Sequence, residues 1–188
     1  MHQNQGSFLN KEERQQLLKV SRECLEHYFN TGKHFDCSEK NLSGNLKVQT
    51  GAFVSIYVNS DLRGCIGRMS SDMPLYKLVQ QMTISAANND SRFKSLNQNE
   101  LKNTRIELSV LTPMKRIDDI SEIELGKHGI YIKEGYYSGT FLPQVAEKTN
   151  WTIEEFLGYC SRDKARIGWE GWKTAELYIY ETIILKEN

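Results

Sequence analysis

Hydrophobic positions in the first part of the chain follow the spacing of an α-helix. Asn10 and Glu13 form the pattern of a capping box, which predicts a helix from Asn10 to about residue 29. Its apolar stripe comprises Leu17, Cys24, Leu25, Tyr28 and Phe29. We expect Cys24 to pack in the core with the rest of this stripe. Residues 31–50 contain few apolar side chains, so residues 1–50 are predicted to form an N-terminal helix and a long loop.

Further along the chain the hydrophobic period changes to two. Residues 53–58 and 62–69 are rich in strand-forming side chains and flank the turn sequence 59–61, which predicts a β-hairpin. Helical spacing returns over residues 71–89. Residues 104–112 then alternate between apolar and polar side chains, as in a strand with one face in the core.

The second half of the chain repeats this order. Residues 129–133 and 136–142 predict another hairpin, and residues 144–148 predict a short helix. A second capping box opens a helix at Thr152, and residues 174–185 alternate as a final strand. Hairpin, helix and strand therefore occur twice. We predict an α+β protein of two structural repeats that join in one curved sheet with flanking helices.

Composition limits the classes of function. The 188 residues fit a single domain over 1–188 or two small lobes, and the 24 basic and 24 acidic side chains cancel. The chain therefore has no net positive charge that would attract nucleic acid or an anionic membrane. The N-terminus lacks the features of a signal peptide, so we expect a cytoplasmic protein. The cysteines lack the spacing of a zinc site, and we expect free thiols, no metal and no cofactor. They are Cys24, Cys37, Cys65 and Cys160.

The strongest local signal for chemistry is the hexapeptide Leu62-Arg63-Gly64-Cys65-Ile66-Gly67. Alternation along a strand predicts that Arg63 and Cys65 point to the same face. A nearby cation favours the thiolate, which is the reactive form of cysteine. Alternatively, the glycines admit a neighbouring backbone and Cys65 is a small buried hydrophobic residue.

Other polar residues lie where elements end or alternate. Asp90 and Arg92 follow the predicted helix and could face a cleft, or form an ordinary surface pair. Glu107 lies on the polar face of its strand, as many solvated residues do. Imidazole is the side chain type suited to proton transfer near neutral pH, so His128 is the best candidate for a general base, although a turn histidine is often ordinary. Gln144 begins a helix that could bind an anion or a carbonyl, or be a plain junction.

Together these residues resemble the AMMECR domain family, whose prokaryotic members are called AmmeMemoRadiSam system protein A. The resemblance covers the chain from about Gly51 to its end. Its segments are Gly51-Ala52-Phe53-Val54, Leu62-Arg63-Gly64-Cys65-Ile66-Gly67, Asp90-Ser91-Arg92-Phe93, Ile106-Glu107-Leu108-Ser109-Val110-Leu111-Thr112-Pro113, Gly126-Lys127-His128-Gly129 and Gly139-Thr140-Phe141-Leu142-Pro143-Gln144-Val145. The resemblance implies a barrel-like mixed sheet, a signature cysteine at Cys65, and a pathway or complex shared with a Memo-type protein and a radical SAM protein. Arg166 stands where the family usually has glycine.

The leading hypothesis is an enzyme, or a component of one, with a cleft around Cys65. Arg63 would stabilise the thiolate or a bound anion, and His128 or Glu107 would transfer protons. Three further residues would position an unknown small-molecule ligand: Asp90, Arg92 and Gln144. The alternative is a non-catalytic binding or adaptor protein that acts through a Memo-type or radical SAM partner, with an exposed apolar patch as its interface.

Overall fold

The structure is a computed structural model that describes residues 8–35, 37 and 41–187. Residues 1–7, which carry the expectation that the chain has no signal peptide, lie outside these residues, as does part of the predicted loop. The described chain divides into two compact units. The first extends to Val110 and resumes at Ile183, and the second is Leu111–Thr182. No helix in the described ranges is long and apolar enough to cross a membrane.

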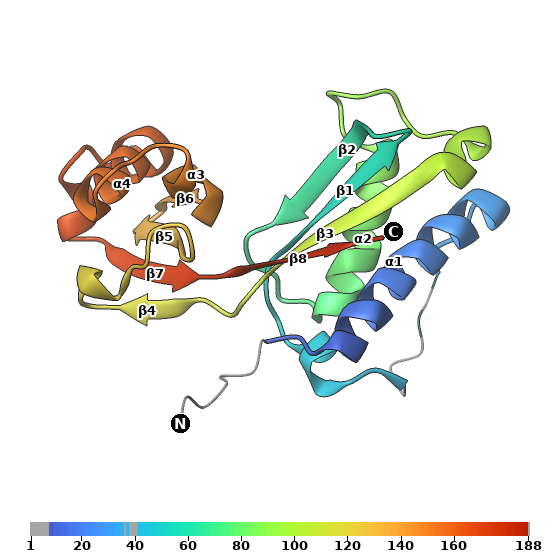
Figure 1. Ribbon diagram of the computed structural model, residues 1–188, viewed down its shortest axis with the longest axis horizontal. Coiled ribbons are helices and arrows are strands. Elements are labelled where there is room, and N and C mark those ends of the chain that lie inside the picture. Colours follow the sequence, from blue (N-terminus) through green and yellow to red (C-terminus); the bar gives the residue numbers. More distant parts are fainter. Residues whose placement is uncertain (1–7, 36, 38–40, 188) are drawn as a thin grey trace. The chain divides into compact units, whose positions relative to one another are not determined.

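The first unit contains two long helices and four strands (Figure 1). Its elements are α1 (Lys11–Thr31), η2 (Gly44–Lys47), β1 (Ala52–Val58), β2 (Asp61–Arg68), α2 (Leu75–Asn88), η3 (Gln98–Asn103), β3 (Thr104–Leu111) and β8 (Thr182–Lys186). The strand order is β2-β1-β3-β8. The predicted capping box of α1 is confirmed, because Asn10 accepts from the Glu13 N–H and Glu13 accepts from the Asn10 N–H. The predicted hairpin is also present.

The second unit contains shorter elements. They are β4 (Lys115–Ile117), η4 (Ile120–Glu122), β5 (Gly129–Glu134), β6 (Tyr137–Phe141), α3 (Pro143–Glu147), α4 (Ile153–Tyr159), the π-helix η5 (Cys160–Ala165), η6 (Gly171–Lys173) and β7 (Glu176–Tyr180). The strand order is β4-β7-β5-β6. The capping box of Thr152 and Glu155 is confirmed. Arg166 keeps the left-handed conformation that usually selects glycine, with φ of 61°.

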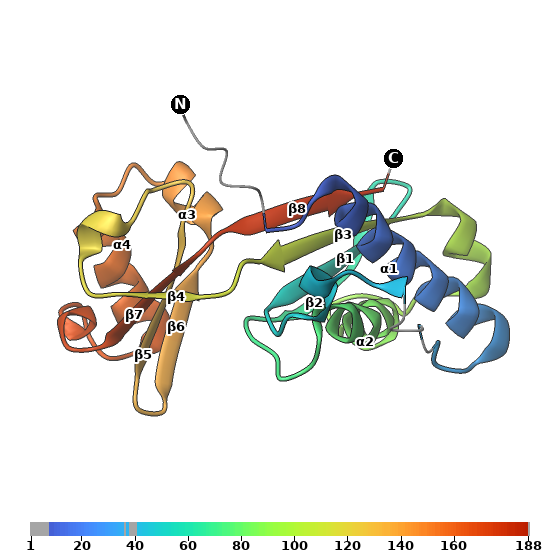
Figure 2. The same ribbon diagram turned by 90° about the horizontal axis from the view of Figure 1, so that it is seen from below.

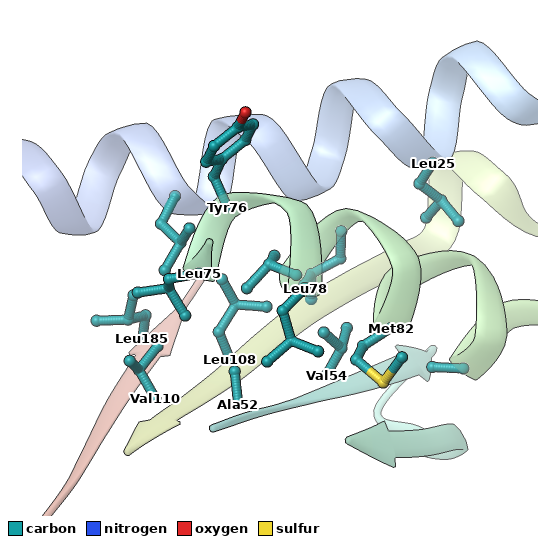
Figure 3. Packing of buried hydrophobic residues seen from close by; sticks show 14 of the residues in the cluster. Leu25, Ala52, Val54, Leu75, Tyr76, Leu78, Met82, Leu108, Val110 and Leu185 are labelled. Atoms are coloured by element: carbon teal, nitrogen blue, oxygen red, sulfur yellow. The ribbon is translucent and has the colours of Figure 1, made fainter. Parts of the chain in front are cut away.

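The side chains on one face of the first sheet form its core with α1 and α2 (Figure 3). Leu25 of α1 and Leu75, Leu78 and Met82 of α2 meet the inward side chains of β1, β3 and β8. These inward side chains include Ala52, Val54, Leu108, Val110 and Leu185. We call the opposite side the outer face. Alternation places Ser55, Cys65 and Glu107 on that face, and each is half-buried.

The prediction of a single barrel-like mixed sheet is wrong. The α+β class is confirmed, but the strands form two four-stranded antiparallel sheets, and neither sheet is closed. The predicted final strand is two strands, β7 and β8, which belong to different sheets. The apolar positions 177, 179, 183 and 185 keep one period of two on both sides of Glu181, so the pattern shows an interruption there but does not reveal that the chain changes sheets. Strand β4 and the π-helix were not predicted.

The two repeats exchange their last strands. In each sheet the hairpin lies beside the strand that follows it, giving β2-β1-β3 and β6-β5-β7. Strand β4 follows β3 along the chain but pairs in the second sheet, whereas β8 follows β7 and pairs in the first, a connectivity that can be traced in Figure 2. Each repeat therefore supplies the fourth strand of the other repeat's sheet.

The repeats also share their register. Ile56 pairs with Gly64 on one side and Ile106 on the other. Ile132 pairs in the same way with Gly139 and Leu177. Counting from these two rows, Cys65 of the first sheet is equivalent to Thr140 of the second. The second repeat thus shows what the fold itself requires at each position of the candidate site.

Candidate functional site

The two glycines of the hexapeptide serve packing. A Cβ atom at Gly64 would lie 1.9 Å from the carbonyl oxygen of Ala86 in α2. Gly139, the equivalent residue, meets η5 in the same way, since a Cβ there would lie 2.3 Å from the Ala165 nitrogen. Gly67 admits the ring of Phe53 instead. Close approach of a helix to the second hairpin strand is therefore a property of both repeats.

The chemistry of the hexapeptide belongs to Cys65 on the outer face. The Ser55 hydroxyl donates to its sulfur, at an Oγ to Sγ distance of 3.3 Å. The Arg92 guanidinium lies beside the same residue and donates to its carbonyl oxygen at 2.9 Å. A hydroxyl donor and a guanidinium are the groups that stabilise negative charge on sulfur. Thr140, at the equivalent position, instead bonds to the Ile130 carbonyl and the Tyr180 hydroxyl.

A polar row crosses all four strands of the first sheet at this level. Ser55 pairs directly with Cys65 on one side and with Glu107 on the other. Glu107 forms an ion pair with Lys186 of β8 at 3.0 Å. The row therefore runs thiol, hydroxyl, carboxylate and ammonium. Directly opposed residues on neighbouring strands have Cβ atoms about 5 Å apart, so Ser55 lies between the thiol and the carboxylate.

Asp90 and Arg92 hold the free edge of β2. Asp90 Oδ2 accepts the Cys65 N–H at 2.8 Å, while Arg92 donates to the Cys65 carbonyl. The pair thus replaces the neighbouring strand that an edge strand lacks. Hydrogen bonds from Arg92, working against burial, hold the pKa of the Asp90 carboxyl well below its usual 3.8. The hydrogen bond to Asp90 raises the pKa of Arg92, with a further contribution from the neighbouring Cys65.

Arg63 does not accompany Cys65 as simple alternation predicts. A β-bulge leaves it without a partner in β1, because Ile56 pairs with Gly64 and Tyr57 pairs with Leu62. Its guanidinium donates to both carboxylate oxygens of Glu100, at 2.8 and 2.9 Å, and to a neighbouring backbone carbonyl. The guanidinium beside Cys65 is instead that of Arg92, which donates to the Cys65 carbonyl. A role of Arg63 in binding a ligand stays a prediction.

His128 lies in the second unit and is 9% exposed. Its Nδ1 accepts the Glu124 backbone N–H at 3.1 Å, so the proton of the neutral ring is on Nε2. Nε2 faces Glu181 at 3.9 Å, beside a cavity of about 120 Å³ that also touches Lys115. In this tautomer Nε2 donates a proton rather than accepting one. In this arrangement His128 therefore has no free nitrogen with which to act as the predicted general base.

We expect this tautomer of His128 to persist in solution. Long-range proton–nitrogen NMR spectra near neutral pH should show Nδ1 as the unprotonated nitrogen of His128, because the Glu124 N–H occupies its lone pair. The exposed His34 serves as a control and should show both tautomers in exchange. A His128 ring with its proton on Nδ1 would contradict the assignment and restore Nε2 as a base.

Gln144 also lies in the second unit, in the first turn of α3. Its side-chain oxygen is buried and has no hydrogen-bond donor among the described residues.

The part of the chain that the structure describes contains no cluster of three or more potential metal ligands. Burial raises the pKa of the Cys24 thiol to about 11 and that of Cys160 to about 12, so both are unreactive core residues.

The sequence did not point to Ser55 or Lys186. Ser55 follows the outer-face alternation of β1, but only the strand register brings it beside Cys65. Lys186 lies one residue beyond the predicted last strand, and its partner Glu107 is 79 positions away. Of the seven predicted site residues, the structure gathers Cys65, Asp90 and Arg92 in direct contact, with Glu107 in the same row.

Comparison with known proteins supports the relationship that the motifs imply. The AMMECR1 family model matches residues 18–185. Protein MK0488 of Methanopyrus kandleri is 33% identical, over 97% of this chain and 92% of that protein. Protein NEQ441 of Nanoarchaeum equitans is 34% identical, over 92% of this chain and 99% of that protein. The crystal structure of the uncharacterised protein PH0010 from Pyrococcus horikoshii is similar with a TM-score of 0.75 and 30% identity, over 97% of this chain and 95% of that one.

Proposed function

The chain belongs to the AMMECR1 family, and within it we propose that this protein is an enzyme, or a component of one, that works through Cys65 on the outer face of the first sheet. The observation that carries the proposal is the polar row of thiol, hydroxyl, carboxylate and ammonium across four strands. The fold does not require it, because the second sheet carries Thr140, Tyr131 and Tyr178 at the positions of the first three groups.

The row assigns a role to each group. Cys65 is the nucleophile, and the Ser55 hydroxyl holds its sulfur in place and stabilises the thiolate. Glu107, the next group in the row, is the carboxylate assigned to accept the thiol proton. Arg92 fixes the backbone of Cys65 and places a positive charge beside it. As a positioning residue, Asp90 keeps that guanidinium in place.

A second candidate is a binding protein without catalysis. The observation in its favour is that the three larger hollows found in the first unit, of about 310, 410 and 620 Å³, involve α1, α2 and η3 and do not include Cys65. The outer face would then be a recognition surface. In either case the partners that the family resemblance suggests are a Memo-type protein and a radical SAM protein.

Thiol labelling tests the proposal. With iodoacetamide near neutral pH, Cys65 should be alkylated while Cys24 and Cys160 stay unlabelled, because their thiols are buried and their pKa values are raised. Peptide mass spectrometry resolves the sites. Ser55→Ala should slow the labelling of Cys65 about fivefold, the equivalent of one hydrogen bond of about 1 kcal/mol.

Incubation of the protein with a metabolite extract extends the test. An adduct or bound molecule should appear by mass spectrometry on the native chain and be absent from Cys65→Ser. Slow labelling of Cys65 that Ser55→Ala leaves unchanged would overturn the nucleophile assignment and favour the binding protein.

A further inference from the structure

An aromatic side chain lies next to Cys65 on the outer face. Phe53 precedes Ser55 by two residues on β1 and pairs with Gly67, two residues beyond Cys65. A Cβ atom at Gly67 would lie 2.3 Å from Phe53 Cδ1 and 2.4 Å from Cγ, so the ring occupies the space above this glycine. Phe53 is half-buried. A ring held against the sheet in this way presents its other face for stacking.

Two ion pairs near Cys65 expose positive charge. In the ion pair of Lys186 and Glu107, the lysine side chain is 56% exposed and the carboxylate 17%. In the pair of Arg92 and Asp90, the arginine side chain is 62% exposed and the carboxylate 3%. Both pairs therefore turn their cations to solvent and their carboxylates inward. A ligand that approaches Cys65 meets an ammonium and a guanidinium, which favour an anionic group.

The second repeat shows a ring in the corresponding region. Tyr180 lies over Gly129, where a Cβ atom would be 2.5 Å from its Cζ, and its hydroxyl meets Thr140 Oγ1 at 2.8 Å. Thr140 is the equivalent of Cys65, and Ser109 is the equivalent of Tyr180. Ser109 and Cys65 are two strands apart, about 10 Å, so this short side chain does not reach the thiol. The first sheet lacks a ring at the position of Tyr180 and carries one at the position of Gly129 instead, where Phe53 lies.

We propose that the outer face of the first sheet binds a planar, anionic small molecule, whose conjugated ring stacks on Phe53 and whose negative group meets Lys186 or Arg92. The proposal rests on the proposed function in one respect, that Cys65 is accessible and reactive. It adds the chemical class of the ligand. The ring, the thiol and the Arg92 guanidinium lie at neighbouring positions of β1 and β2, so a single molecule can reach all three, and Lys186 extends the same polar row to β8.

Two disulfide reagents of opposite character test this class. 5,5′-Dithiobis(2-nitrobenzoate) is aromatic and anionic, whereas cystamine is aliphatic and cationic. With either reagent the Cys65 thiolate attacks one sulfur of the disulfide, a new S–S bond forms, and the other half leaves as a thiolate. In a Cys37→Ser background, the rate of modification of Cys65 should saturate with the aromatic reagent and rise linearly with cystamine, because only the aromatic reagent binds before it reacts.

Variants of Phe53 locate the binding step. Phe53→Leu should abolish saturation and slow the aromatic reagent about tenfold, the equivalent of about 1.4 kcal/mol, while the rate with cystamine stays the same. Phe53→Tyr retains the ring and should retain saturation. Tyr57→Leu is the matched control on the same strand and face, because the Tyr57 ring is already covered by Arg105 at 4.9 Å.

The outcomes separate the two proposals. If Cys65 reacts with iodoacetamide but the aromatic reagent shows linear kinetics that Phe53→Leu leaves unchanged, the ligand class is wrong and the proposed function stands. If Cys65 reacts with none of the three reagents, both are wrong. If Phe53→Leu loses saturation together with its native circular dichroism, that variant has lost its fold, and Phe53→Tyr is compared with Tyr57→Leu instead. Loss of saturation in Phe53→Tyr then overturns the stacking proposal.

Discussion

Gly64→Ala is expected to lower the free energy of unfolding of the first unit by at least about 3 kcal/mol. The new Cβ atom would lie 1.9 Å from the Ala86 carbonyl oxygen and 2.9 Å from its carbon. Both atoms belong to the backbone of α2, so no side-chain rotation relieves the overlap. The helix must move away from β2, which opens the core between them. Urea unfolding followed by far-UV circular dichroism measures the loss.

The same substitution at Gly44 is the control. No atom lies within 4 Å of the position of a Cβ there. Its effect should stay within about 0.5 kcal/mol, as at ordinary surface sites. Gly139→Ala tests the repeat, since its Cβ atom would meet the backbone nitrogen of Ala165. If Gly64→Ala is as stable as Gly44→Ala, the hexapeptide glycine is not explained by helix packing.

Asp90→Asn is expected to destabilise the first unit by about 2 kcal/mol near neutral pH. Asp90 accepts from the Cys65 N–H through Oδ2 and from the Arg92 N–H and Nε through Oδ1. An asparagine has one oxygen and one NH₂ group, so either orientation turns a donor toward another donor. The edge of β2 at Cys65 loses part of its clamp, and the iodoacetamide labelling rate of Cys65 should change with it.

The effect of Asp90→Asn should depend on pH in a defined direction. The pKa of Asp90 is lower in the folded protein than its usual 3.8, chiefly because of its hydrogen bonds with Arg92. Its contribution to stability is therefore complete above about pH 4 and is lost as the pH falls further. The difference between the native chain and the variant should be constant from pH 7 to 5 and shrink below pH 4. A difference that grows on acidification would contradict the stabilising role of the Asp90 carboxylate at the edge of β2.

Asp119→Asn is the matched control for this pH profile. Asp119 also accepts a backbone N–H, from Ser121 at 2.8 Å, but it is exposed and does not hold a strand edge. The variant should show a smaller change in unfolding free energy than Asp90→Asn at neutral pH. Comparable losses for the two would mean that the Asp90 contribution is an ordinary capping effect.

Local signals in the sequence predict the elements of this fold well. The capping boxes at Asn10 and Thr152 and the turn at residues 59–61 depend on interactions within a few residues, and each marks an element boundary that the structure confirms. The pairing of β8 with β3 depends on residues about 75 positions apart along the chain. Alternation is the same whichever sheet a strand joins, so the exchange of strands and the two separate sheets were not predictable.

The candidate site divides in the same way. Cys65 was identifiable from its own segment, and Asp90 and Arg92 from theirs. The sequence did not reveal which guanidinium lies beside Cys65, because the bulge at Arg63 depends on the pairing of β1 with β2. Ser55 and Lys186 enter the site only through cross-strand register. Residue types reveal candidates, but the sheet determines which of them meet.

The exchanged strands impose an order on folding during synthesis. All four strands of the second sheet precede β8 along the chain, so that sheet can form before β8 is available. The first unit begins earlier but waits for β8, which carries Leu185 into its core and Glu187 to the Ile106 N–H. Until β8 has left the ribosome, one edge of β3 is unpaired. The unit that carries Cys65 therefore begins to emerge before the second unit and is finished after it.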